Sequence, residues 1–221
     1  MNNRQKRKRI KIGSTAKQRR KNKELCKRYP FLIPRNVWTD KIAWDYRDVK
    51  KYGYTLVEDF PTGWWKSFGL MMCEELREEL IKYNYLEKFR FEQIKEKYGR
   101  LEAYHNGIPK ESSINNIIEK YSILSENICI SCGKPDVPML YDGWYSPYCF
   151  DCHRKKYYNI KKPINQVKAE YDNYICDKQH WMSNTYTVRH YSKDKSWDET
   201  IDISDTANKI RENWRMRKIG N

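Results

Sequence analysis

Two short cysteine motifs carry the sharpest chemical signal in this sequence. Cys129 and Cys132 form one Cys-x-x-Cys pair, and Cys149 and Cys152 form a second pair after a spacer of sixteen residues. Two residues between thiolates allow both sulfurs of a tight turn to reach one ion at about 2.3 Å, so two such turns make a tetrahedral S₄ site. The spacer is typical of a zinc site. The pattern predicts one structural Zn²⁺, with iron as the main rival metal.

Four protein ligands would leave the ion no position for a catalytic water, so we expect no enzyme at this site. The spacer lacks the histidines that a zinc-fingered HNH nuclease would need. Pro147-Tyr148-Cys149 resembles part of a deaminase motif, but His105 is followed by Asn-Gly instead of x-Glu. A thiol oxidoreductase would use one Cys-x-x-Cys beside a βαβ unit, not two matched pairs.

The remaining cysteines give weaker signals. Cys176, His180 and His190 lie close enough in sequence to hold a second metal ion, but no fourth ligand is evident. Cys26 and Cys73 have no partner motif. Cys73 falls within an apolar helical pattern, where a thiol is expected to be a core residue.

Basic residues are concentrated at the start of the chain. Residues 1–28 contain thirteen Lys or Arg residues and a single acidic residue, Glu24. With few large apolar side chains, this segment is predicted to be a disordered arm, and its charge suits a polyanion, because pairing with phosphates releases counterions. A solubilising tail, a targeting signal and an acidic protein partner remain alternatives. The candidate nucleic-acid contacts are Arg4, Lys6, Arg7, Lys8, Arg9, Lys11, Lys17, Arg19, Arg20, Lys21 and Lys23 in the arm, with Arg154, Lys155 and Lys156 directly after the last cysteine.

Four aromatic residues lie between or beside the cysteine pairs, namely Tyr141, Trp144, Tyr145 and Tyr148. Such rings can stack on unpaired bases. They can also cover a metal site against neighbouring helices. Packing is the favoured interpretation of the two.

The composition favours a modest folded core. The chain has 221 residues with 33% charged residues and a formal net charge of +15, a balance that leans toward disorder. The 18 Tyr and 8 Trp residues offset this, because each large ring can bury roughly 150–250 Å². No apolar run approaches the roughly 20 residues of a membrane helix, and the start of the chain does not resemble a secretory signal.

Periodicity predicts the elements that would position these residues. Residues 29–62 are expected to be extended. Apolar residues then recur every three or four positions from Trp64 to Leu80, which predicts an amphipathic helix. Residues 88–106 favour a hairpin that turns near Gly99. Later elements are a helix after Pro109, capped by Ser112 or Ser113, helical segments over 154–180 interrupted at Pro163, a strand over 185–191 and a last helix capped by Ser204.

The expected fold class is α+β. A small helix–hairpin–helix domain over residues 29–127 would be fused to a structural zinc ribbon at 128–153. The disordered basic arm of residues 1–28 would precede it, and a basic α/β extension of residues 154–221 would follow.

Several motifs together resemble a group of phage and prophage zinc-ribbon proteins of unassigned function. The resemblance rests on LCKRYPFLIPRNVW, GWWKSFGLMMCEEL, QIKEKYGRLEAY, CISCGKP and GWYSPYCFDC, and it covers residues 25–155. It implies a compact unit of helix, hairpin, second helix and ribbon, and an origin in a phage or mobile element within a bacterial cytoplasm. It implies no activity.

The predicted function is that of a non-enzymatic accessory protein that binds DNA or RNA. The basic arm would supply affinity, and the ribbon with its basic flank would position the strand. The alternative is an interaction module that binds a host protein machine, since exposed Trp and Tyr residues are favoured interface anchors. No membrane partner and no small-molecule substrate are expected.

Overall fold

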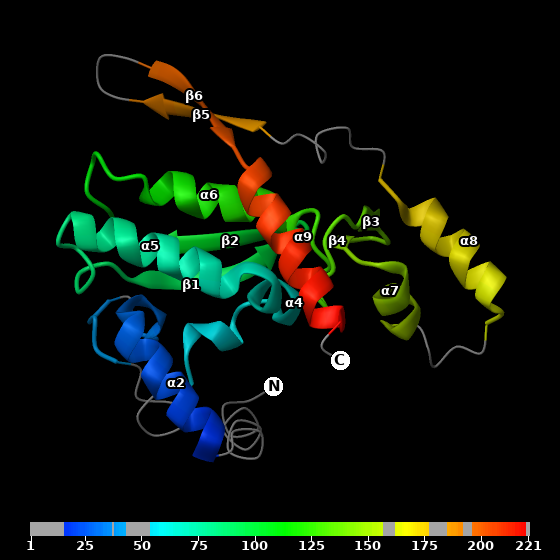
Figure 1. Cartoon of the computed structure of the whole chain (residues 1–221), viewed down its shortest axis with the longest axis horizontal. Helices are drawn as coiled ribbons and strands as arrows, with labels where there is room; N and C mark the ends of the chain where they lie inside the picture. The colour runs from blue at the N-terminus through cyan, green and yellow to red at the C-terminus, as the bar shows by residue number, and fades with distance from the viewer. Residues whose placement is uncertain are drawn as a thin grey trace. The chain divides into compact units, whose positions relative to one another are not determined.

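The computed structural model describes residues 16–36, 38–42, 54–156, 162–176, 185–191 and 196–219 (Figure 1). Helices and two-stranded sheets both occur among them, so the predicted α+β class is confirmed at this level. No helix in this part of the chain is long and apolar enough to cross a membrane. The helical elements are α2 (Ala16–Arg28), η1 (Pro30–Leu32), η2 (Leu56–Glu58), α4 (Thr62–Trp64), η3 (Trp65–Gly69), α5 (Leu70–Lys82), α6 (Ile114–Ser125), α7 (Phe150–Lys156), α8 (Ile164–Tyr174) and α9 (Ser204–Ile219).

Three pairs of strands make up the sheets in the described part of the chain. They are β1 (Phe91–Lys97) with β2 (Arg100–His105), β3 (Met139–Tyr141) with β4 (Tyr145–Pro147), and β5 (Thr185–Tyr191) with β6 (Ser196–Asp202). The β3–β4 and β5–β6 pairs are antiparallel.

The chain divides into two compact units whose segments alternate along the sequence. The first unit is Met1–Phe60, Cys73–Lys95 and Glu102–Ile114, and the second is Pro61–Met72, Glu96–Leu101 and Asn115–Asn221. The domains predicted from the sequence are instead consecutive segments, with boundaries after residues 28, 127 and 153, and this division stays a prediction.

The predicted disordered arm is wrong for residues 16–28, which form helix α2. Asn22 and Cys26 are buried on one side of this helix, and Asn22 donates a hydrogen bond to Glu58. At the end of the helix, Arg28 pairs with Glu74 of α5, which also accepts from Tyr29. Glu74 thus offsets part of the positive charge, and burial of one side gives the helix tertiary support. Residues 1–15, including Arg4 to Lys11, lie outside the described residues.

Aromatic rings form the centre of the first unit. Phe31 of η1 meets Phe89 and Phe91 edge to face at 5.8 and 5.7 Å between ring centroids. Such edge-to-face contacts stabilise a core beyond simple burial. Residues 29–62, which were expected to be extended, contain short helical turns. Pro30 starts η1, and Thr55 caps η2 together with Glu58 in a capping box.

The helix predicted from Trp64 onward is present, but it begins with an unusual turn. Residues Trp65–Gly69 form a π-helical turn, η3, between α4 and α5. Arg217 of α9 donates a hydrogen bond to the carbonyl of Lys66 in this turn at 2.7 Å. The C-terminal helix is therefore held against η3 in the second unit, and a further clamp joins Arg211 of α9 to the Asp136 carboxylate.

The hairpin and the helix that follows it also match their predictions. Strands β1 and β2 turn at Tyr98-Gly99, and α6 begins directly after Ser113. In the second unit, Arg100 of β2 joins the hairpin end to α6, because its guanidinium donates to Ser122 and pairs with Glu119. Farther along the chain, α7 and α8 lie on either side of Pro163, and β5 and α9 occupy the predicted positions. Strand β6 was not predicted.

Candidate metal centre

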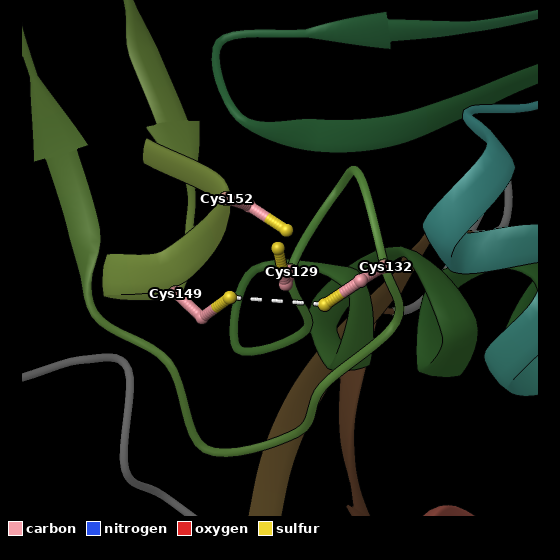
Figure 2. A group of neighbouring side chains, drawn as sticks. All are labelled: Cys129, Cys132, Cys149 and Cys152. Carbon is pink, nitrogen blue, oxygen red and sulfur yellow. Dashed lines mark hydrogen bonds between the residues drawn. The ribbon is translucent and has the colours of Figure 1, made fainter. Parts of the chain in front are cut away.

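The four motif cysteines lie together in space (Figure 2). Their four Sγ atoms are all within 4.8 Å of one another, and Cys132 Sγ is 3.7 Å from Cys149 Sγ. Sulfurs bound to one tetrahedral ion at about 2.3 Å would be about 3.8 Å apart, so this separation fits a shared metal. The distance is far longer than the roughly 2.05 Å of a disulfide. All seven cysteines belong to the described residues, and all are free thiols.

The first cysteine pair sits on a tight turn. The N–H of Cys129 donates to the Lys134 carbonyl, and the N–H of Gly133 donates to the Cys129 carbonyl, both at 2.8 Å. Gly133 has a φ of +82°, which an L side chain rarely adopts, so glycine is needed there. An isolated bridge between Ile128 and Pro135 closes the base of the turn. This turn brings both thiols of the pair into the cluster (Figure 2).

The second pair is positioned by the start of a helix. Cys149 directly precedes α7, Cys152 lies in its first turn, and the N–H of His153 donates to the Cys149 carbonyl at 3.0 Å. The β3–β4 hairpin returns the chain to this helix, and Ile130 N–H bonds the Pro147 carbonyl at the end of β4. This bond ties the second pair to the turn that carries the first.

Helix α4 supports the turn from outside in a way that the cysteine spacing does not reveal. Gly63 donates its N–H to the Ile130 carbonyl at 2.9 Å, and Trp64 Nε1 donates to the Ile128 carbonyl at 2.8 Å. A Cβ on Gly63 would lie 2.2 Å from the Cys129 carbonyl oxygen, so the two backbones are in direct contact. Trp64 is fully buried. In the sequence, Gly63-Trp64 gave no sign of this role beyond the start of a helical pattern.

Burial and hydrogen bonds make the four thiols unequal. Cys129 and Cys149 are buried, whereas Cys132 and Cys152 are partly exposed. The hydrogen bond from Cys149 holds the pKa of Cys129 below its usual range, and the same contact raises the pKa of Cys149. Backbone donors act with it on Cys129. The cluster therefore favours a thiolate at Cys129, which is the form that binds a metal.

The aromatic residues near the cluster divide into two groups. Tyr148 packs against the buried cysteines, as the packing interpretation expected. Its carbonyl accepts a hydrogen bond from the Tyr171 hydroxyl of α8 at 2.8 Å. Tyr141 and Trp144 are instead 50% and 48% exposed.

Cys176 is not part of the group that these four cysteines form among the described residues. Cys176 lies beyond α8, with its N–H bonded to the Met139 carbonyl at 2.9 Å. His180 lies outside the described residues, and the side chain of His190 lies outside them as well, so a second metal site stays untested.

The predicted basic contacts are only partly described. Arg20, Lys21 and Lys23 are exposed on α2, and Arg19 is half-buried. Lys155 is exposed and Arg154 is half-buried on α7. The side chains of Lys17 and Lys156 lie outside the described residues.

No protein-family model, no curated protein and no solved structure matches this chain. The resemblance to phage zinc-ribbon proteins therefore stays a prediction, and the function has to be argued from the chain's own residues.

Proposed function

We propose that the four cysteines hold one structural Zn²⁺ ion in a ribbon fused to the helix–hairpin–helix domain. The 3.7 Å contact between Cys132 and Cys149 supports this, because it matches the edge of a tetrahedral ZnS₄ site. Four thiolate ligands complete the coordination of such an ion. The ion would then fix the fold and would not activate water, so we propose no catalytic role for this site.

We further propose that the chain is an accessory protein of phage or mobile-element origin that binds nucleic acid. The observation that carries this proposal is the exposed basic side of helix α2. Arg20, Lys21 and Lys23 are exposed, whereas Asn22 and Cys26 on the opposite side are buried. An anchored helix holds its cations in place before a polyanion arrives, which reduces the ordering cost of binding.

The ion pairs of α2 leave this basic side available. Lys27 pairs with Glu24 within the helix, and Arg28 pairs with Glu74. Both of these cations are near the C-terminal end of α2, whereas Arg20, Lys21 and Lys23 lie toward its middle. Contacts from such cations to phosphates supply affinity that does not depend on base sequence. On α7, exposed Lys155 would add a second contact after the last cysteine ligand.

The test is a titration of labelled duplex and single-stranded oligonucleotides with the full chain over a series of salt concentrations. The variant replaces Arg20, Lys21 and Lys23 with Gln. Its control replaces Lys82, Lys88 and Lys110, which are exposed cations of the first unit outside α2, so both proteins have the same net charge. The slope of log K against log salt is negative, and each lost phosphate contact reduces its magnitude by about 0.9. We therefore expect the slope of the α2 variant to be less steep by roughly 2–3 units.

The control variant should show nearly the same salt dependence of binding as the unmodified chain. Equal losses in both variants would show that only net charge matters and would contradict a role for α2. If the unmodified chain binds no oligonucleotide at low salt, the nucleic-acid function is wrong, and the interaction with a host protein becomes the function to pursue.

A further inference from the structure

Two turns of the second unit bring a pair of exposed aromatic rings together. Tyr98 lies at the turn between β1 and β2, and Trp144 lies in the loop between β3 and β4. Their rings are stacked, with 5.3 Å between the centroids and 24° between the planes. Tyr98 is 58% exposed and Trp144 is 48% exposed, so each ring keeps about half of its surface open to solvent.

The turn that carries Tyr98 is strained. Tyr98 has a φ of +52° and is followed by Gly99 at +81°. Two residues with positive φ are typical of a tight hairpin turn, where Asn-Gly is the favoured sequence. A bulky residue in the first position carries a conformational cost. Because the ring is largely exposed, core packing does not compensate for that cost.

A single carboxylate fixes the geometry of the pair. Glu96 Oε1 accepts a hydrogen bond from the Gly99 N–H at 2.7 Å and another from Trp144 Nε1 at 3.0 Å. Gly99 also lies directly on the buried Met139 of β3, since a Cβ there would be 2.5 Å from its sulfur. The hairpin turn and the β3–β4 loop are therefore held together, and the rings are ordered before any ligand arrives.

We propose that the Tyr98–Trp144 pair binds an unpaired base of a single-stranded nucleic acid by continuing the stack. Every base offers a flat face to an aromatic ring, whereas the bases of a duplex are already stacked on one another. Lys97 Nζ lies 5.7 Å from the Tyr98 ring and supplies a cation beside the stack for the adjacent phosphate. Tyr141, the last residue of β3, is 50% exposed and offers another ring next to this loop, with its ring centroid 4.7 Å from that of Tyr145.

The inference rests on the proposed nucleic-acid function and adds its substrate class. A protein partner is the competing occupant. Single strands are favoured over a protein because the two rings already lie nearly parallel, with a cation beside them, on a chain of net charge +15.

The test uses the full zinc-loaded chain and three labelled probes, oligo(dT), oligo(rU) and a mixed-sequence duplex of equal length. Variants Tyr98→Ala and Trp144→Ala remove one ring each. Trp38→Ala is the control, because Trp38 is 90% exposed and belongs to the first unit. Tyr98→Phe keeps the ring and should keep binding. Circular dichroism and zinc content of each variant establish that the fold is intact.

We expect each ring deletion to weaken binding of the single strands roughly ten- to hundredfold, with less than about a twofold change for the duplex. The two single-stranded probes separate a preference for DNA from one for RNA. Equal losses on duplex and single strands, or no loss at all in a folded variant, would overturn the inference. Binding to the duplex alone would overturn it while the nucleic-acid function stands, and binding to no probe would overturn both. A ring variant that keeps its affinity for single strands but loses a protein partner would identify a protein surface instead.

Discussion

Cysteines fall into two groups in this chain, and their neighbouring groups distinguish them. Cys129, Cys132, Cys149 and Cys152 share a polar environment of neighbouring thiols and backbone donors. Cys26 of α2 and Cys73 of α5 are buried singly in the first unit. Burial raises the pKa of Cys26 to about 12, with Glu58 adding to the effect, and burial also raises the pKa of Cys73. These two thiols are therefore neutral packing groups.

This difference predicts a loss of stability at high pH. In the unfolded chain a thiol ionises near pH 8.5, but Cys26 and Cys73 keep their protons in the folded state until a higher pH. The unfolded state therefore binds fewer protons above about pH 9, and the free energy of unfolding falls as pH rises toward 12. Each such thiol contributes up to about 1.4 kcal/mol per pH unit in this range.

Urea unfolding between pH 8 and 11 checks this expectation. Cys73→Ala should reduce the slope of stability against pH, even though it lowers stability at every pH. Leu76→Ala is the matched control, because Leu76 is fully buried one turn along α5 and does not titrate. It should lower stability without changing the slope. A slope that is identical in the two variants would contradict this expectation, because it would show that the pKa of Cys73 does not differ between the folded and unfolded states.

At the scale of elements, helix α4 and the Cys129–Gly133 turn are joined by main-chain contacts. Gly63 touches the turn through its hydrogen bond to Ile130, and a Cβ on Gly133 would lie 2.5 Å from the Gly63 carbonyl. A side chain at position 63 or 133 would collide with backbone atoms, which cannot move aside as the end of a flexible side chain can. Helix α4 can therefore approach the turn this closely only because both residues are glycine.

Gly63→Ala should destabilise the protein strongly. The added methyl group would meet the Cys129 carbonyl oxygen at 2.2 Å, and relief of such overpacking costs about 1–3 kcal/mol or more. We also expect weaker retention of the metal in competition with a chelator, because the displaced backbone carries Cys129. The measurements are denaturant unfolding and metal release.

Gly143→Ala is the comparison for that variant. Gly143 has a φ of +95° and open space around its Cα, so alanine there introduces backbone strain without a clash. It should lower stability by about 1–2 kcal/mol and leave metal retention unchanged. A Gly63 variant that retains metal as well as the Gly143 variant would contradict the importance of the α4 contact.

Local patterns in the sequence predicted the elements better than their contacts. The three- and four-residue spacing from Trp64 to Leu80 predicted the main helix, and Gly99 marked the hairpin turn. No local pattern predicted the π-helical turn η3. The hydrogen bond from Arg217 to the Lys66 carbonyl in this turn joins residues that are far apart in the sequence. Helix α2 was missed for the same reason: its charges dominate its composition, and its stabilising partners Glu58 and Glu74 are distant in sequence.

For the metal centre, too, the sequence predicted local features but not long-range contacts. Cysteine spacing alone identified all four candidate ligands, because a Cys-x-x-Cys turn is a local structure. The exposed Tyr98–Trp144 stack could not be derived in this way. In the sequence Tyr98 is one residue of a hairpin with no link to Trp144, and the two rings meet only in the folded chain.

At the scale of the whole molecule, the two compact units predict different responses to metal removal. The cysteine cluster belongs to the second unit, whereas the aromatic centre around Phe31 belongs to the first. A chelator should therefore remove hydrogen-exchange protection from amides near the cluster, such as those of Gly63, Cys129 and Ile130, because a metal held by the four cysteines would couple binding to folding there. Amides of the first unit, such as those of Tyr29 and Phe89, should stay protected.

Two serine variants make this experiment specific. Cys149→Ser should be purified with far less than one zinc per chain and should show the exchange pattern of the chelated protein. Cys176→Ser changes a cysteine outside the cluster and should resemble the unmodified chain. Uniform loss of protection across both units would contradict independent responses, and full zinc content in Cys149→Ser would contradict the proposed ligand set.

The bond between Trp64 and Ile128 has a consequence for the timing of synthesis. Its two residues are 64 positions apart, and Cys149 follows later still. At roughly 5–20 residues per second, α4 leaves the ribosome about 3–13 seconds before the turn on which it packs. During that interval the large apolar face of Trp64 has no turn to cover it, and the four-cysteine cluster is not yet complete. The side chain of Trp64 is therefore open to solvent or to chaperones in that interval, and a metal held by the four cysteines can act only after Cys152 has been synthesised.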